Sequence, residues 1–204
     1  MTNDCSMRYV ALLRGINVGG NRKVEMARLR DTFQRLGLSN VQTFIASGNV
    51  VFSSPSTDPG ALTRRIEAGI AADFGFEVAV LLRDHDQIAA LVKAIPVDWV
   101  NDSNMKCDVM FLWPEVDSPD SVALPKADPE IEDVLYHPGA IVWRVDRANQ
   151  SRRRVTKIVG TPLHRSMTVR NPNTVRSLLQ MMEAGEESPR TTSRKSSKVP
   201  RRPK

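Results

Sequence analysis

The sequence predicts an α+β protein made of two ferredoxin-like (βαββαβ) subdomains in tandem, with an extra C-terminal helix. Two observations lead to this prediction. Short apolar runs and segments with helical spacing follow one another in the order β-α-β-β-α-β over residues 7–83, the order of the split βαβ motif. A similar order, with weaker signals, returns over residues 107–184.

The first strand, loop and helix are marked by a change of pattern near the N-terminus. Residues 9–13 form a continuous apolar run, as in a strand that other elements cover. After a glycine-rich loop, apolar residues recur every three to four positions, as in a helix that buries one face. Gly37 stands where a helix C-cap is expected. The apolar stripe comprises Met26, Leu29, Phe33 and Leu36.

A hairpin and a second helix complete the first half. Residues 41–53 predict a hairpin turned at Ser47-Gly48-Asn49, residue types that accept positive φ. Asp58-Pro59 is a typical helix start, because Asp accepts bonds from free N–H groups and Pro fits the first helical position. A fourth strand is expected at 78–82. The stripe of the second helix comprises Leu62, Ile66, Ile70 and Phe74.

The pattern restarts after a helix over residues 84–94 and a loop. Residues 107–113 form the next apolar strand, and Ser118-Pro119 opens a short helix. A hairpin is predicted over 132–145, with its turn at Pro138-Gly139.

The end of the second half is predicted as a helix, a short strand and a last helix. We expect the helix over 151–159 and the strand at 167–169. Asn171-Pro172 caps the last helix, which ends before Gly185. Its buried face comprises Val175, Leu178, Leu179 and Met182.

These elements divide the chain into five segments. In order they are a disordered extension (1–6), the first subdomain (7–83), a connecting helix and loop (84–106), the second subdomain with the C-terminal helix (107–184), and a disordered basic tail (185–204).

The positive charge of the chain is concentrated in the tail. Residues 185–204 hold seven cations and two anions, a net +5 of the +6 of the whole chain. A segment rich in Ser, Thr, Pro and charge cannot bury a core, so we expect it to be disordered and either solubilising or a non-specific nucleic-acid contact. The contacting residues would be Arg190, Arg194, Lys195, Lys198, Arg201, Arg202 and Lys204.

The remaining composition indicates a cytoplasmic protein without a cofactor or metal. Two cysteines, Cys5 and Cys107, give neither a disulfide framework nor metal spacing, and a buried, reduced Cys107 is favoured over a redox role. The three histidines are scattered. No apolar run is long enough to span a membrane, and the N-terminus does not resemble a signal peptide. The oligomeric state stays open.

Polar residues are predicted to converge at one end of the first sheet. In the βαββαβ order the first and third strands are antiparallel neighbours, so the end of the first strand lies beside the 47–49 turn. Guanidinium, carboxamide and backbone N–H donors of this kind suit an anion. The residues are Arg14, Gly15, Asn17, Gly19, Gly20, Ser47, Gly48 and Asn49.

Two other interpretations of this loop are weighed. Gly15 and Gly20 have P-loop spacing, but Asn21-Arg22 replaces the Lys-Ser/Thr pair that contacts phosphate and magnesium, so the sequence disfavours a nucleotide-hydrolysing P-loop. Alternatively, Arg14 closes a strand end and the other residues only shape turns.

A second candidate cluster precedes the last helix. It comprises Thr168, Arg170, Asn171 and Thr174. Arg170 and Asn171 lie at a helix N-terminus, whose partial positive charge favours an anion, and we expect them to close the first site if the halves meet. The alternative is that Asn171 is simply the cap.

No catalytic set emerges, so enzymatic activity stays undecided. No carboxylate pair, Ser-His-Asp set, Cys-His pair or metal cluster can be assembled from the sequence. Ser47 and Lys157 come nearest to a nucleophile and an acid or base. The leading hypothesis is a small anionic or phosphorylated ligand at the glycine loop and the Ser-Gly-Asn turn. The alternative is a nucleic-acid-binding accessory protein that acts through its tail.

Several motifs resemble one family. Residues 9–20, Met26 and 47–52 resemble the opening of domain-of-unknown-function family 1697, and Lys157, 160–162 and 168–175 resemble its closing segment. Pro172 departs from the aromatic residue that many relatives have there. The resemblance spans residues 7–184 and implies a bacterial cytosolic protein with two ferredoxin-like subdomains. It implies no activity, ligand or catalytic residue.

Overall fold

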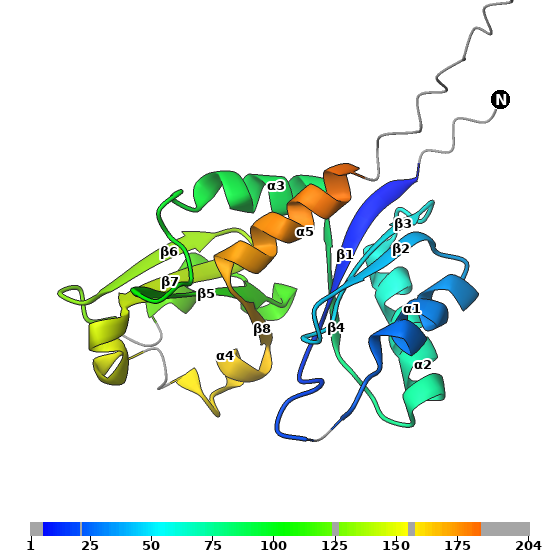
Figure 1. Ribbon diagram of the computed structural model, residues 1–204, viewed down its shortest axis with the longest axis horizontal. Coiled ribbons are helices and arrows are strands. Elements are labelled where there is room, and N and C mark those ends of the chain that lie inside the picture. Colours follow the sequence, from blue (N-terminus) through cyan, green and yellow to red (C-terminus); the bar gives the residue numbers. More distant parts are fainter. Residues whose placement is uncertain (1–5, 21, 124–126, 155–157, 185–204) are drawn as a thin grey trace, which may run out of the picture.

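The computed structural model describes residues 6–20, 22–123, 127–154 and 158–184 and contains two four-stranded antiparallel sheets with several helices (Figure 1). The elements of the first part are β1 (Met7–Leu13), α1 (Met26–Arg35), β2 (Ser39–Phe44), β3 (Asn49–Ser54), α2 (Pro59–Phe74), β4 (Val80–Asp84) and α3 (His85–Ala94). Those of the second part are β5 (Met105–Leu112), η1 (Pro114–Val116), η2 (Pro119–Ala123), β6 (Glu132–His137), β7 (Ala140–Asp146), η3 (Arg147–Arg152), α4 (Pro162–Arg165), β8 (Met167–Arg170) and α5 (Pro172–Ala184), where η marks a 3-10 helix.

The two sheets have the same strand order. The first runs β2-β3-β1-β4 and the second β6-β7-β5-β8, with each central pair antiparallel. Their registers match as well, since the last residue of β1, Leu13, pairs with Val80, and the last residue of β5, Leu112, pairs with Met167. The duplicated strand pattern that the sequence predicts is therefore present in both halves.

The outer face of the first sheet is covered by α1 and α2 (Figure 1). Phe52 of β3 stacks on Tyr9 with 5.8 Å between ring centroids and meets Phe33 of α1 edge to face at 5.4 Å. Asp58 caps α2 by accepting a bond from the Ala61 N–H, and Gly75 ends it at φ 78°, as predicted.

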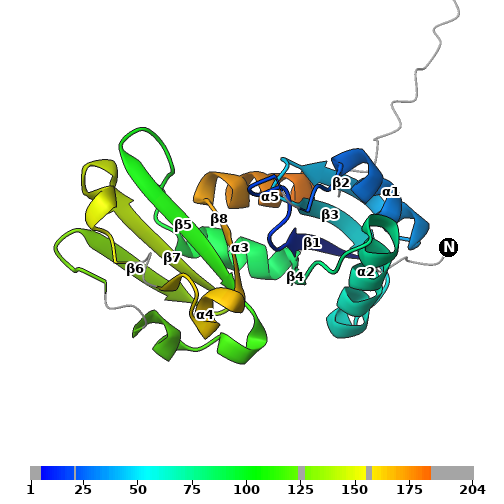
Figure 2. The ribbon, with the colours of Figure 1, turned by 90° about the horizontal axis from the view of Figure 1, so that it is seen from below.

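The inner faces of both sheets share one core with α3 and α5. Figure 2 shows these two helices between the sheets. Val10 and Val51 from the first sheet, Val109 and Phe111 from the second, and Leu178 of α5 belong to the same buried cluster. Cys107 lies in it, fully buried as expected, and burial raises the pKa of its thiol to about 12, so the thiol is neutral at physiological pH. A shared core couples the folding of the halves.

The helix predicted over 151–159 is wrong. The chain instead forms η3, which ends at Arg152, and α4, which begins at Pro162, while residues 155–157 lie outside the description. The reason is a contact with a residue distant in sequence: the Arg154 N–H donates to the buried Glu132 carboxylate at 2.7 Å rather than to a helical carbonyl. Leu163 of α4 and Ile158 cover the outer face of the second sheet, where they belong to one buried cluster with Met167 of β8.

The described residues contain neither a membrane-spanning helix nor a metal-binding cluster. No helix among them is long and apolar enough to cross a membrane. No group of three or more His, Cys, Asp or Glu side chains among them is placed to hold a metal ion.

We expect Leu178→Ala to lower the free energy of unfolding by about 2–5 kcal/mol, because it removes a fully buried side chain from the shared core. Urea denaturation followed by circular dichroism and by tryptophan fluorescence should give coincident transitions. All three tryptophans come after α3, so fluorescence reports the second half alone.

The exposed Lys93→Ala on α3 is the control and should change the free energy by less than about 0.5 kcal/mol. A separate, unshifted circular-dichroism transition for the first half would show that the halves unfold independently and that the core is not shared in energetic terms.

Candidate functional site

The glycine loop (residues 14–24) follows β1 and has an unusual backbone. Gly15, Asn17, Gly19, Gly20 and Arg22 all have positive φ. A Cβ on any of the three glycines would meet no atom within 4 Å, so glycine is needed there for conformation and not for space. Left-handed residues alternating with others turn successive N–H groups inward, which makes concavities that bind anions.

Asn17 holds this loop in shape. Its Nδ2 donates to the carbonyl oxygens of Val24 (3.0 Å) and Ala46 (2.8 Å), and its Oδ1 accepts the Val24 N–H at 2.8 Å. The carboxamide predicted as a ligand donor therefore closes the loop and ties it to the β2-β3 turn. Both Nδ2 hydrogens are used in these bonds, so the side chain keeps no donor for an anion.

The end of β1 lies beside the β2-β3 turn, as the strand order predicts. The Leu13 N–H donates to the Gly48 carbonyl at 2.9 Å. Gly48 has φ 80°, and a Cβ there would lie 2.6 Å from Ile16 Cδ1, so no other residue fits. Ile45, not Asn49, is the second left-handed residue of the turn, at φ 48°. Asn49 is instead the buried first residue of β3, and its Nδ2 donates to Phe44 O and Ser47 Oγ.

Arg170 of β8 crosses from the second half to this strand end. Its side chain is buried among neutral acceptors, and desolvation lowers its pKa to about 10. All five of its N–H groups have acceptors. The bonds run from Nε to Asn49 Oδ1 (2.5 Å), from Nη1 to Thr168 Oγ1 (3.0 Å) and Val169 O (2.8 Å), and from Nη2 to Leu13 O (2.9 Å) and Gly48 O (3.1 Å).

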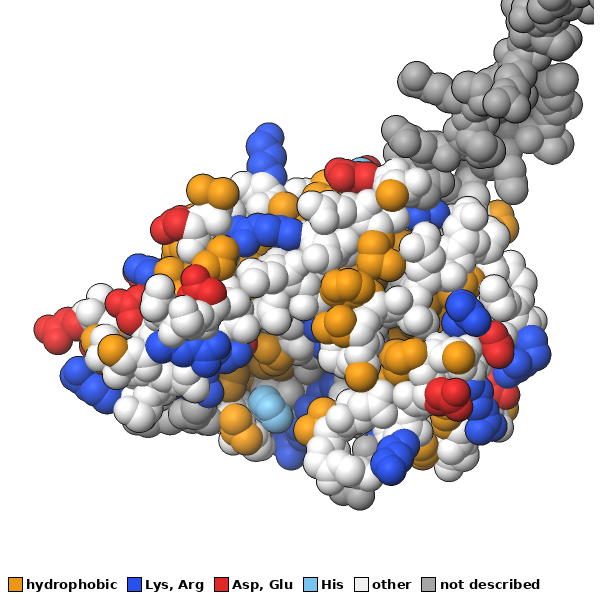
Figure 3. Space-filling model, viewed as in Figure 1, with side chains coloured by type: hydrophobic (Ala, Val, Ile, Leu, Met, Phe, Trp, Pro, Cys, Tyr) orange, Lys and Arg blue, Asp and Glu red, His pale blue; other side chains and the backbone are white. Residues whose placement is uncertain are grey.

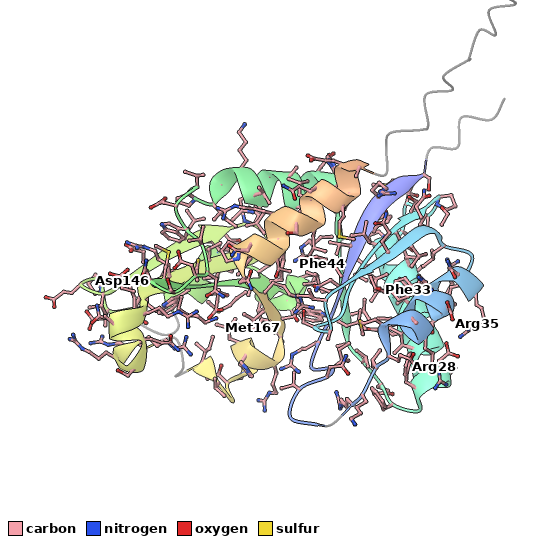
Figure 4. The ribbon with its side chains drawn as sticks, in the orientation of Figure 1. Arg28, Phe33, Arg35, Phe44, Asp146 and Met167 are labelled. Atoms are coloured by element: carbon pink, nitrogen blue, oxygen red, sulfur yellow. The ribbon has the colours of Figure 1, made fainter. Side chains whose placement is uncertain are left out.

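Arg14 makes the opposite crossing, from the first half to the second. Its Nε donates to Met167 O at 2.9 Å and its Nη2 to His164 O at 3.0 Å. The side chain straps the glycine loop to α4 and leaves Nη1 without an acceptor in the described part of the chain. Figure 4 shows Met167 of β8 and Phe44 of β2 near the middle of the molecule, far from Arg28 and Arg35 on α1.

An equivalent crossing exists at the other end of the contact between the halves. Matching Val80 with Met167 places Arg83 at the position of Arg170. Arg83 Nη2 donates to Leu112 O (2.6 Å) and Gly139 O (3.2 Å), which are the equivalents of Leu13 O and Gly48 O. We call this arrangement the reciprocal arginine pair, Arg83 and Arg170. Such reciprocal contacts are the mark of a twofold relation.

The surroundings of the two arginines differ. Ala140 and Leu81 stand at the positions of Asn49 and Thr168, so Arg83 lacks the two side-chain acceptors that Arg170 has. Burial lowers the pKa of Arg83, and the charges of Asp117 and Asp84 oppose that shift. Sequence reasoning missed Arg83, although its shared spacing with Arg170 before an Asx-capped helix was the available signal.

The predicted site residues are thus brought together, but most serve as framework. Arg14, Asn17, Gly48, Asn49 and Arg170 meet where the halves touch. Asn171 caps α5 by accepting a 2.8 Å hydrogen bond from the Thr174 N–H. No hydrogen bond joins its side chain to the described residues of the glycine loop. Lys157 and the cations of residues 190–204 lie outside the described residues.

Charge near the loop is positive. Arg14, Arg22, Lys23 and Arg165 form no ion pair with any residue that the structure describes. Figure 3 shows a hollow between the halves on this side, with basic side chains and a histidine along it. Backbone N–H groups and unpaired cations of this kind suit an anion, and no group among the described residues of the loop is positioned for covalent catalysis.

Comparisons with known proteins give a family and a structural relative. The family model described as "Protein of unknown function (DUF1697)" matches residues 7–143. The conserved bacterial protein SP0830 of Streptococcus pneumoniae is 30% identical with a TM-score of 0.72, and the match covers 87% of this chain and 99% of that one. None of the curated proteins matches the chain.

We expect Arg170→Met to lower the free energy of unfolding by about 3 kcal/mol, because buried acceptors lose charge-assisted bonds. Arg83→Met should cost less, since Arg83 makes three recorded bonds and Arg170 five. Urea denaturation measures both. An Arg83 variant that is less stable than the Arg170 variant would contradict this ranking.

Proposed function

Since the chain belongs to the DUF1697 family of proteins of unknown function, we propose its function from the site: it binds a small anionic or phosphorylated ligand at the glycine loop and the Ser47–Asn49 turn. The observation that supports this most directly is the loop itself. Five left-handed residues within eight positions, all on the surface, shape its exposed backbone, and two of them, Asn17 and Arg22, are not glycine and adopt this conformation at a cost.

The neighbouring side chains support the same ligand class. Arg14 retains its Nη1 donors, and Arg22 and Lys23 are exposed within the loop. Arg165 lies on α4, to which Arg14 is bonded through His164. A phosphate or carboxylate between the loop and α4 would receive charge-assisted bonds, which are roughly twice as strong as neutral ones.

Arg170, Asn49 and Asn17 have a supporting role in this proposal. Their hydrogen bonds fix the end of β1 and the β2-β3 turn, from which the loop is suspended. A loop held at both ends loses less conformational entropy on binding than a free one. Their substitution would weaken binding by moving the donors.

We infer further that each half is a ferredoxin-like subdomain and that the protein is bacterial and cytoplasmic. The common strand order of the two sheets and the βαββαβ order of the first half support the fold description. The bacterial relative supports the origin, and the reduced, buried Cys107 is in keeping with the cytoplasm.

The test is thermal denaturation of the full chain against inorganic phosphate, pyrophosphate, sugar phosphates, nucleotides and carboxylates. A ligand at ~100 times its Kd adds ~2.7 kcal/mol and should raise the midpoint by several degrees. The double variant Arg22→Gln with Lys23→Gln should reduce that shift by more than half, because it removes two exposed charges without touching the core.

Lys93→Gln, exposed on α3, is the matched control and should retain the full shift. If no compound shifts the midpoint, the small-ligand proposal fails for the classes tested. Salt-sensitive binding of nucleic acid that disappears on deletion of residues 186–204 would instead support the tail-based alternative.

A further inference from the structure

The second arginine of the reciprocal pair borders a cavity that the anion proposal does not use. This Arg83 pocket has a volume of about 420 Å³ and lies between α3, η1 and the β6-β7 turn. Its volume is within the range of roughly 300–1,000 Å³ typical of small-molecule sites. Its lining includes Arg83, Asp86, Ala90, Pro114, Asp117 and Gly139.

Arg83 retains free hydrogen-bond donors at positions where the donors of Arg170 are bonded. Nη1 donates once, to Leu82 O at 2.9 Å, and Nη2 twice. Nε and the second Nη1 hydrogen therefore have no acceptor within the described residues. They correspond to the donors that Arg170 gives to Asn49 and Thr168. A Cβ built on Gly139 would lie 3.2 Å from Arg83 Nε, so the glycine lets this edge of the guanidinium approach the turn.

Carboxylates stand on the same pocket. Asp117 accepts the Tyr136 O–H (3.0 Å) and the Gly139 N–H (2.9 Å) through Oδ1, which fixes its position and leaves Oδ2 without a recorded partner. Asp86 adds a second carboxylate, 99% exposed, from the first turn of α3. These carboxylates would repel a simple anion, and Arg83 would repel a simple cation.

The rest of the lining is mixed. Ala90 of α3 and Pro114 of η1 offer exposed apolar surface, Gln87 and His137 add polar groups, and Leu91 and Phe111 are almost fully buried. An occupant with charges of both signs and an apolar portion would match Arg83, the carboxylates and the apolar part of this lining. Its side chain would remove part of the Ala90 and Pro114 surface from water, at roughly 25 cal/mol per Å².

We propose that the Arg83 pocket binds a small zwitterion of the α-amino-acid class with an apolar side chain. The carboxylate accepts the free Nε hydrogen of Arg83, the ammonium group donates to Asp117 with Asp86 nearby, and the side chain lies against Ala90 and Pro114. The site is separate from the glycine loop and does not rest on the anion proposal.

Isothermal titration calorimetry of the full chain with free leucine and phenylalanine tests the ligand class. Each has two matched probes, one lacking the amine (4-methylpentanoate, 3-phenylpropanoate) and one lacking the carboxylate (3-methylbutylamine, 2-phenylethylamine). The amino acids should bind at least tenfold more tightly than either probe. Equal binding of a single-charge probe, or no heat from the amino acids up to millimolar concentration, overturns the proposal.

Asp117→Asn tests the location. The amide keeps an oxygen for Tyr136 and Gly139 and removes only the charge, so the fold should persist and binding should weaken about tenfold. Asp120→Asn on η2 is the control and should bind as the unaltered chain does. Ala140→Asn adds the acceptor that Asn49 provides in the other half, and should abolish binding by occupying Arg83.

Unchanged affinity in Asp117→Asn overturns the proposal whether or not Ala140→Asn folds. The Arg22→Gln, Lys23→Gln variant separates the two sites, since it should lose phosphate binding and keep amino-acid binding. If this variant loses both phosphate binding and amino-acid binding, the two ligands share the site at the glycine loop, and the proposal for the Arg83 pocket is overturned.

Discussion

The reciprocal arginine pair is the interaction on which the arrangement of the two halves depends. Each guanidinium leaves its own sheet and binds the carbonyl oxygens at the end of the central strand of the other sheet. Neither guanidinium is hydrogen-bonded to a carboxylate of the described residues, so carbonyl dipoles replace much of the water that each group loses on burial. The apolar faces behind the pair, with α3 and α5, add the non-directional part of the attraction.

This contact between the halves determines the role of the polar residues that lie along it. Asn17, Asn49 and Arg170 form one network with the loop and the turn, and most of their donors point into protein. What they leave for a ligand is a shaped backbone and the cations at its rim. At the Arg83 end, the apolar residues Ala140 and Leu81 stand in place of Asn49 and Thr168, so two N–H groups of Arg83 have no acceptor among the described residues. The same framework thus offers two chemically different surfaces.

The strand pattern, most helix starts and the meeting of β1 with the β2-β3 turn follow from local chemistry: apolar period, Asx caps and glycine stops. The failed helix after β7 shows the limit, because Glu132, distant in sequence, captures the N–H of Arg154. The same limit applies to the site. The strand order placed Arg14 beside the 47–49 turn, and Arg170 was expected to close this site if the halves meet. The sequence could not show that the donors of both arginines meet carbonyl oxygens rather than a ligand, since that depends on the packing of one half on the other.

The equivalence of Arg83 and Arg170 also has an evolutionary consequence. A chain of half this length, carrying one such arginine and one such strand end, would be complementary to a second copy of itself, because each copy holds the donor that the other needs. Two copies would associate around a twofold axis. After fusion of their genes the two ends would no longer need the same sequence. A substitution of Asn by Ala beside one arginine would then leave the surroundings of the other arginine unchanged.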